Sequence, residues 1–430
     1  MYIYVVEHST ATYKLLEQFF NYVKIKLIMN LNQLLNKDKQ SVNSPKYGNL
    51  SAAFDDALKE VNELEPNYAK IAKALSNLGE AYNRLKNYEQ ALQYFKQALK
   101  IQQELRKGRH PDLAQELNDD DVRKTHLDLG DEEQALEYLE KALEMQKALH
   151  KEEDHPDLAK ALNDVGITYL NLGDEDQALE YLEKALEMQK ALHKGKDHPD
   201  LAKALKDMGE ACQSVGHHEQ ARDHFAQALQ IQEELYEGKS HKEIARLLTK
   251  AGIASGRSRN YYQAIDYFKQ ALEMKRELYE GKNHIVIADA LNDVGVIYER
   301  LDEYYQALKY FKQALTMHQE LHKGKDHDEV AYALSSVGIA YDNLGKYDQA
   351  LKYLTQALEM RQKLHEGEHH IDLASSLFHM GLTHQRFGQY DQALEYLRQA
   401  LEMSEQLTPD FSTYKLIQDI HRIMDLCNPE

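Results

Sequence analysis

Histidines recur at regular intervals along this 430-residue chain, and imidazole is a side chain that binds metal ions and transfers protons near neutral pH. Two histidines five residues apart across a loop, such as His150 and His155, have no fixed geometry, and no cysteine or carboxylate set completes a tetrahedron around them. The spacing therefore predicts that the histidines cap helices or shape turns, with no metal site and no cofactor. Six of them follow one another at steps of about 43 residues: His155, His198, His241, His284, His327 and His370.

Other residue types that could carry catalysis lack the required pattern. The chain has neither a phosphate-cradling glycine loop nor a nucleophile elbow. Acidic pairs such as Asp174 and Glu175 fall at the turns between predicted helices, where carboxylates stabilise helix starts. A catalytic site needs several different groups that converge once, whereas these residues repeat. We therefore expect that the protein is not an enzyme.

Charge and cysteine content narrow the classes of partner and compartment. The formal net charge is −19, which argues against nucleic acid and anionic membranes as partners, because both are bound mainly through basic surfaces. Two cysteines cannot build a disulfide framework, which is typical of reducing surroundings. No apolar run reaches the length of about 18 residues expected of a spanning helix. We expect a cytoplasmic protein.

One unit, His155 to Asp197, is copied in tandem along most of the chain. Within it, apolar and small residues recur at three- and four-residue steps in two stretches separated by Gly173, which predicts two amphipathic helices. A hairpin of this size cannot bury its apolar face alone, so neighbouring units must stack. Glycines mark the same step from unit to unit: Gly166, Gly209, Gly252, Gly295, Gly338 and Gly381.

The small and aromatic positions of the unit resemble a known repeat. Gly166, Tyr169, Ala178, Leu182 and Ala185 match the spacing of the tetratricopeptide repeat, and the longer period resembles the variety found in kinesin light chains and nephrocystin-like proteins. The resemblance covers residues 68 to about 408. It implies an all-α fold, a right-handed superhelical solenoid of stacked helical hairpins, and binding of a protein or peptide without naming the partner.

The repeats divide the chain into three parts. Residues 1–66 are predicted to form an N-terminal helical cap with a divergent hairpin, residues 67–408 eight tetratricopeptide repeats, and residues 409–430 a C-terminal capping helix. The second repeat, 110–154, is irregular, because Arg123 stands where glycine belongs and Asn118 begins a run of turn-forming residues. We expect a seam there, with easier local opening than in later repeats.

The same resemblance implies that the first helix of each repeat lines a concave groove. Positions on these helices that do not pack vary from repeat to repeat, as expected of a surface adapted to one partner. The partner is expected to be another protein or a peptide, acidic in the sharper hypothesis, and self-association is left open. The predicted groove residues are Lys160, Asn163, Lys203, Lys206, Arg246, Lys250, Arg257, Asn292 and Arg300.

Two questions stay open from the sequence. Arg246 and Lys250 lie four residues apart, on one side of a helix. This placement partly resembles the repeats of cochaperones that bind the terminal carboxylate of a peptide. Alternatively, the lysines pair with Asp164, Asp207 and Glu210 of neighbouring repeats. The second question concerns function. A scaffold that binds a peptide or helical segment in the groove is the main hypothesis, and a sensor whose superhelix changes pitch on binding a small peptide or ligand is the alternative.

Overall fold

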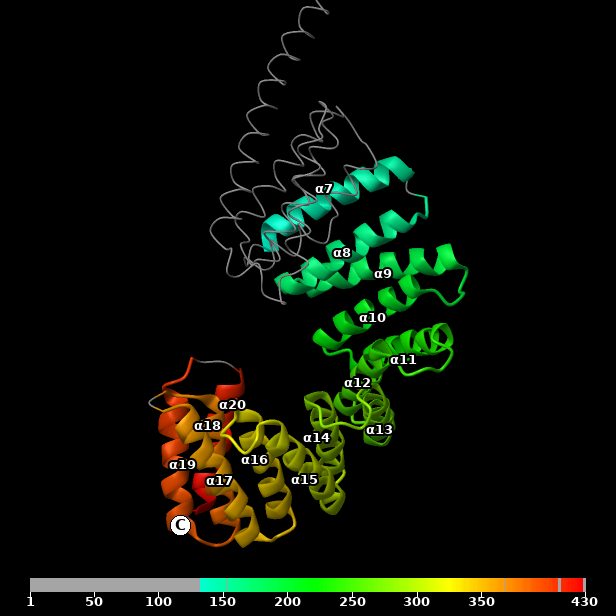
Figure 1. Ribbon diagram of the computed structural model, residues 1–430. Helices are drawn as coiled ribbons and strands as arrows, with labels where there is room; N and C mark the ends of the chain where they lie inside the picture. The colour runs from blue at the N-terminus through cyan, green and yellow to red at the C-terminus, as the bar shows by residue number, and fades with distance from the viewer. Residues whose placement is uncertain (1–131, 152, 367, 409–410, 428–430) are drawn as a thin grey trace, which may run out of the picture. The chain divides into compact units, whose positions relative to one another are not determined.

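The computed structural model describes residues 132–151, 153–366, 368–408 and 411–427 (Figure 1). Over these ranges the chain forms fourteen helices, α7 to α20, and no strand, which confirms the all-α prediction. The predicted N-terminal cap, the first repeat, and the first helix of the irregular second repeat with its seam lie outside the described residues.

The helices form consecutive hairpins. After α7 (Glu132–His150), the first helix of each pair carries an even number and the second helix an odd number. The pairs are α8 (Pro156–Leu172) with α9 (Glu175–His193), α10 (Pro199–Ser214) with α11 (His218–Leu235), α12 (Lys242–Arg257) with α13 (Tyr261–Leu278), α14 (Ile285–Arg300) with α15 (Tyr304–Leu321), α16 (Asp328–Asn343) with α17 (Tyr347–Leu364), and α18 (Ile371–Arg386) with α19 (Tyr390–Glu405), followed by α20 (Phe411–Cys427).

The chain divides into two compact units between Lys196 and Asp197. The first unit contains α7, α8 and α9, and the second contains α10 to α20. In each unit, successive helices pack against one another. At the end of the second unit, α20 covers α18 and α19, and its Ile420, Ile423 and Cys427 are buried in a cluster with Leu397 and Ala400.

The recurring histidines cap the first helices. His155 is extended, with φ −143° and ψ 139°, and its Nδ1 accepts the backbone N–H of Asp157 at 3.2 Å. This contact satisfies one of the donors that a helix start leaves without a partner. His198, His241, His284, His327 and His370 make the same contact with the residue two positions on. The predicted capping role is confirmed.

Small residues hold the two helices of a hairpin close together. A Cβ built on Gly166 would lie 2.7 Å from Cγ of Leu182, and one on Gly295 would lie 2.5 Å from Cε1 of Phe311. Both partner side chains are almost fully buried, with 1% exposed. The absent glycine side chain is therefore the space that the second helix fills.

In the second unit, polar contacts join each first helix to a neighbouring first helix. Lys250 Nζ of α12 lies 3.1 Å from Glu210 Oε1 of α10, and Asn343 Nδ2 of α16 donates to Glu299 Oε1 of α14 at 3.0 Å. Arg386 of α18 donates to Asn343 Oδ1 at 3.1 Å. We call the surface formed by α10, α12, α14, α16 and α18 the first-helix wall.

Candidate partner-binding site

The nine predicted groove residues all lie on first helices. Lys160 and Asn163 belong to α8 of the first unit, where Asn163 is only 6% exposed and so offers little surface to a partner. The other seven belong to the second unit. Three of these, Arg257 of α12 with Asn292 and Arg300 of α14, line one cavity. The sequence predicted that all nine residues line one groove, but it did not predict that these three line a common cavity.

This cavity has a volume of about 730 Å³, within the range of small-molecule and peptide pockets. Its apolar lining comes from the facing sides of α12, α13 and α14, namely Ile253, Phe268, Val296 and Ile297. Its polar lining is Arg257, Arg259, Asn292, Asp293, Arg300, Tyr261 and Tyr332. We call it the arginine cavity.

Arg259 and Tyr332 were missed from the sequence. Arg259 follows the end of α12 and has a φ of 61°, so its position depends on the turn rather than on helical periodicity. Tyr332 comes from α16 in the next repeat and is 49% exposed. The sequence signal available was the pair Arg257 and Arg259 at the end of a first helix, with no acidic residue between Leu247 and Tyr262.

The basic residues of the second unit differ in whether a carboxylate already neutralises them. Lys250 pairs with Glu210 at 3.1 Å, Arg246 with Glu243 at 3.2 Å, and Lys206 with Asp207 at 3.5 Å. The contact between Lys250 and Glu210 is the internal pairing that the sequence offered as an alternative to partner binding. Within the described part of the chain, by contrast, no ion pair or hydrogen bond engages the side chains of Arg257, Arg259 and Arg300.

Two buried polar groups lie among these arginines. Burial raises the pKa of Asp293 to about 6, and Lys275 of α13 partly opposes this shift through its positive charge. Asn292 Nδ2 donates to the hydroxyl of Tyr332 at 3.4 Å, while Asn292 Oδ1 is buried without a hydrogen bond to the described residues. Beside the Asp293 carboxyl group, the cavity thus offers guanidinium donors, which suit a carboxylate, and one amide acceptor, which suits a peptide N–H.

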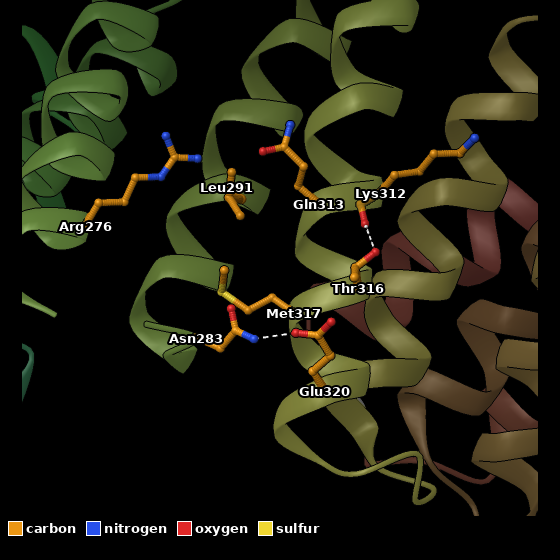
Figure 2. Close-up of a pocket in the computed structure, with 8 residues that line it drawn as sticks. All are labelled: Arg276, Asn283, Leu291, Lys312, Gln313, Thr316, Met317 and Glu320. Carbon is orange, nitrogen blue, oxygen red and sulfur yellow. Dashed lines mark hydrogen bonds between the residues drawn. The ribbon is translucent and has the colours of Figure 1, made fainter. Parts of the chain in front are cut away.

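A second cavity, of about 340 Å³, lies against α15 (Figure 2). Its charged groups are of both signs, and the Glu320 carboxylate already accepts a hydrogen bond from Asn283 Nδ2. Figure 2 shows Arg276 on a separate helix, apart from Lys312. Because the lining carries both positive and negative charges, and Glu320 already has a hydrogen-bond partner, the cavity favours neither cationic nor anionic ligands.

One zinc-type pattern in the sequence does not form a zinc-type site. Residues His365 to His369 read H-E-x-x-H, which places two imidazoles on one face when the pattern lies within a helix. In the structure, α17 ends at Leu364 and α18 begins at Ile371. The two histidines therefore lie in the connection between helices and lack the helical register.

None of the described helices is long and apolar enough to cross a membrane.

Several solved structures are similar to parts of this chain. BtubC (BKLC) from P. vanneervenii is 19% identical over 55% of this chain and 94% of its own, with a TM-score of 0.45. A putative kinesin light chain with nearly identical TPR-like repeats from Podosopora anserina is 16% identical over 50% and 99%, with a TM-score of 0.44. A tetratricopeptide repeat protein from Parabacteroides merdae is 16% identical over 72% and 98%, with a TM-score of 0.46.

No curated protein matches the chain. A family model described as tetratricopeptide repeat matches residues 54–119, 124–191, 192–234, 243–320, 286–363 and 343–406. These segments cover most of the sequence and include every described hairpin from α8 to α19 in whole or in part. The chain belongs to the tetratricopeptide repeat family.

Proposed function

We propose that this protein is a non-enzymatic scaffold that binds an acidic peptide segment of a partner protein at the arginine cavity. Tetratricopeptide repeats generally serve protein interaction, and stacked repeats present extended binding surfaces. The proposal rests on one observation above others. Arg257, Arg259 and Arg300 line one cavity, and among the described residues no carboxylate forms an ion pair or hydrogen bond with their side chains.

The energetic argument concerns what each group loses on binding. Lys250 and Arg246 would have to give up their contacts with Glu210 and Glu243 before they could bind a partner carboxylate. Among the described residues, Arg257 and Arg300 have no such contact to break, and the charge of Arg300 acts on its neighbour Glu299. A hydrogen bond to a charged group contributes about 1.5 to 3 kcal/mol when it is partly desolvated, so the arginine cavity has the greater net gain available.

The net charge of −19 strengthens this choice of site. An acidic segment is repelled by most of such a protein and is attracted only where cations are not neutralised. Electrostatic complementarity of this kind selects the partner and its position more than it adds affinity. We therefore expect binding to weaken as ionic strength rises.

The test uses an array of ten-residue peptides rich in Asp and Glu, each with a matched peptide in which Asn and Gln replace the acids. Affinity for the best acidic peptide is measured by fluorescence anisotropy with the full chain. The double variant R257Q/R300Q is expected to lower affinity on the order of 100-fold, from two contacts of about 1.4 kcal/mol or more. The matched control, R246Q/K250Q, removes two cations of the same wall that are already paired and is expected to stay within about twofold.

Two results would count against the proposal. If no acidic peptide binds better than its uncharged match, the cavity does not select carboxylates. If R246Q/K250Q abolishes binding while R257Q/R300Q leaves it intact, the site is centred on Arg246 and Lys250 rather than on the arginine cavity.

A further inference from the structure

Two histidines and one carboxylate meet where α15 passes into α16. His318 lies in the last turn of α15, and His322, four residues further on, is the residue that follows the end of that helix at Leu321. Glu329 lies in the first turn of α16. The Nε2 atom of His322 is 2.7 Å from Glu329 Oε2, and the Nδ1 atom of His318 is 3.7 Å from the same oxygen. One ligand atom from each of the three residues lies within 4.8 Å of the others.

His318 occupies an unusual environment for a polar side chain. It is 4% exposed, and its Nδ1 atom has no hydrogen-bond partner among the described residues. Buried polar atoms in proteins nearly always have a partner. The unpartnered nitrogen faces the Glu329 carboxylate at a distance too long for a hydrogen bond.

Packing does not explain why both residues are histidine. At the position of His318 the other described repeats carry glutamine, lysine, arginine or serine: Gln146, Gln189, Gln232, Lys275, Arg361 and Ser404. At the position of His322, two other described repeats carry tyrosine, and three carry histidine, namely His150, His193 and His365. Tyr236 and Tyr279 stack on the capping histidine that follows them at 3.7 Å, as His322 does on His327. A pair of histidines at these two positions occurs in one described repeat.

A second cluster with the same composition has a different geometry. The rings of His150 and His155 stack at 3.4 Å with an angle of 11° between their planes. Lone pairs lie in the plane of each ring, so two stacked rings do not direct them to one ion. His150 is also occupied, since its Nε2 lies 3.1 Å from Gln146 Oε1. The ring centroids of His318 and His322 are farther apart, at 6.4 Å, with 17° between the ring planes.

We propose that His318, His322 and Glu329 bind a divalent transition-metal ion of the zinc type at the junction of α15 and α16. Two imidazoles and one carboxylate form a common set of protein ligands for zinc, with a fourth position open. Tetrahedral bonds of about 2.0 to 2.1 Å place ligand atoms about 3.3 Å apart, so side-chain rotation of roughly 1 Å closes the site. The fourth ligand is water or Asp289 of α14, whose charge acts on His318.

An ion at this place would join two successive repeats. It bridges the last turn of α15 to the first turn of α16 across the connection between them. Metal binding to the folded state adds to folding stability, because the site does not exist in the unfolded chain. The role is thus structural and independent of the arginine cavity.

The test measures zinc binding by calorimetry and cobalt binding by visible absorption, on the full chain without a histidine tag and after treatment with a chelator. In the wild-type protein, this site is expected to bind one zinc ion with higher affinity than the other histidine sites do. The cobalt-loaded protein is expected to show the strong visible absorption bands of tetrahedral cobalt. H318Q and H322Y introduce residues that other repeats carry at these positions, so both variants are expected to fold. Each is expected to weaken this binding on the order of 100-fold.

The matched control is H365Y. His365 occupies the position of His322 in the following repeat and stacks on His370 at 3.9 Å, but Arg361 stands in place of the second histidine. This variant is expected to keep the high-affinity zinc site, and saturating zinc is expected to raise its melting temperature as in wild type. Unchanged zinc affinity in both H318Q and H322Y, or no high-affinity binding by the wild type, would overturn the proposal.

Discussion

Asp293 shows how a single residue in the arginine cavity couples stability to pH. Its carboxyl group is half-buried among the helices, and burial raises its pKa from 3.8 to about 6, with the charges of Lys275 and Asp289 as smaller influences. A carboxyl group with a raised pKa binds its proton more tightly in the folded chain than in the unfolded chain. Stability contributed by that proton is present below about pH 4 and is lost as pH rises through about 6.

Replacing Asp293 by asparagine removes this dependence. D293N is expected to be more stable than wild type at pH 7.5 by about 1 to 2 kcal/mol, after allowance for solvent screening, and by a clearly smaller margin at pH 4.5. Urea unfolding followed by circular dichroism at both pH values measures the difference. The control is D266N, which removes an exposed carboxylate from α13. A D293N variant that is less stable than wild type at pH 7.5 would contradict the argument.

At the scale of the helix, two glycines of the second unit differ in what an added methyl group would meet. A Cβ on Gly295 would press on the buried ring of Phe311 at 2.5 Å and 2.7 Å, whereas a Cβ on Gly256 would meet mainly the flexible end of Ile297 at 3.0 Å. Overpacking costs about 1 to 3 kcal/mol, and alanine gains up to about 1 kcal/mol over glycine inside a helix. The same substitution therefore changes sign between the two positions.

We expect G295A to lower the apparent free energy of unfolding by about 1 kcal/mol and G256A to leave it unchanged or raise it slightly. Thermal and urea unfolding of the two variants beside wild type provide the comparison. Both variants replace glycine by alanine inside a helix, so helix propensity alone predicts the same increase in the free energy of unfolding for each. Equal effects in the two variants would show that Phe311 yields to the added methyl group.

The elements were predictable from the sequence because their causes are local. Two sets of residues repeat with the unit, namely Gly166 with its equivalents and the capping histidines. Each of these residues acts within a few residues or within one hairpin. The arginine cavity was only partly predictable, since Arg257, Arg300 and Tyr332 come from three successive repeats. Their meeting depends on how first helices pack, and Arg259 depends on a left-handed turn. The ion pairs of Lys206 and Arg246 likewise depend on side-chain direction, which spacing does not fix.

At the scale of the whole molecule, each helix of the second unit packs mainly on its immediate neighbours in the chain. The stability of such an array is approximately a sum of the stabilities of repeats and of the interfaces between them. A defect at one end should therefore loosen the adjacent repeat and leave distant repeats protected. The C-terminal end offers a direct test, because α20 covers the last hairpin with Ile420, Ile423 and Cys427.

Truncation after Leu407 removes this cover and exposes Leu397 and its neighbours, at a cost of about 1.5 to 3 kcal/mol for each large apolar side chain returned to water. Amide hydrogen exchange is expected to accelerate in α18 and α19 and to stay unchanged in α10 to α12. The control is Y414S, because Tyr414 lies on α20 with 61% of its surface exposed and its loss removes no buried contact. Uniform acceleration from α10 to α19 would show instead that the second unit unfolds as one cooperative body, and that its ends stabilise its centre.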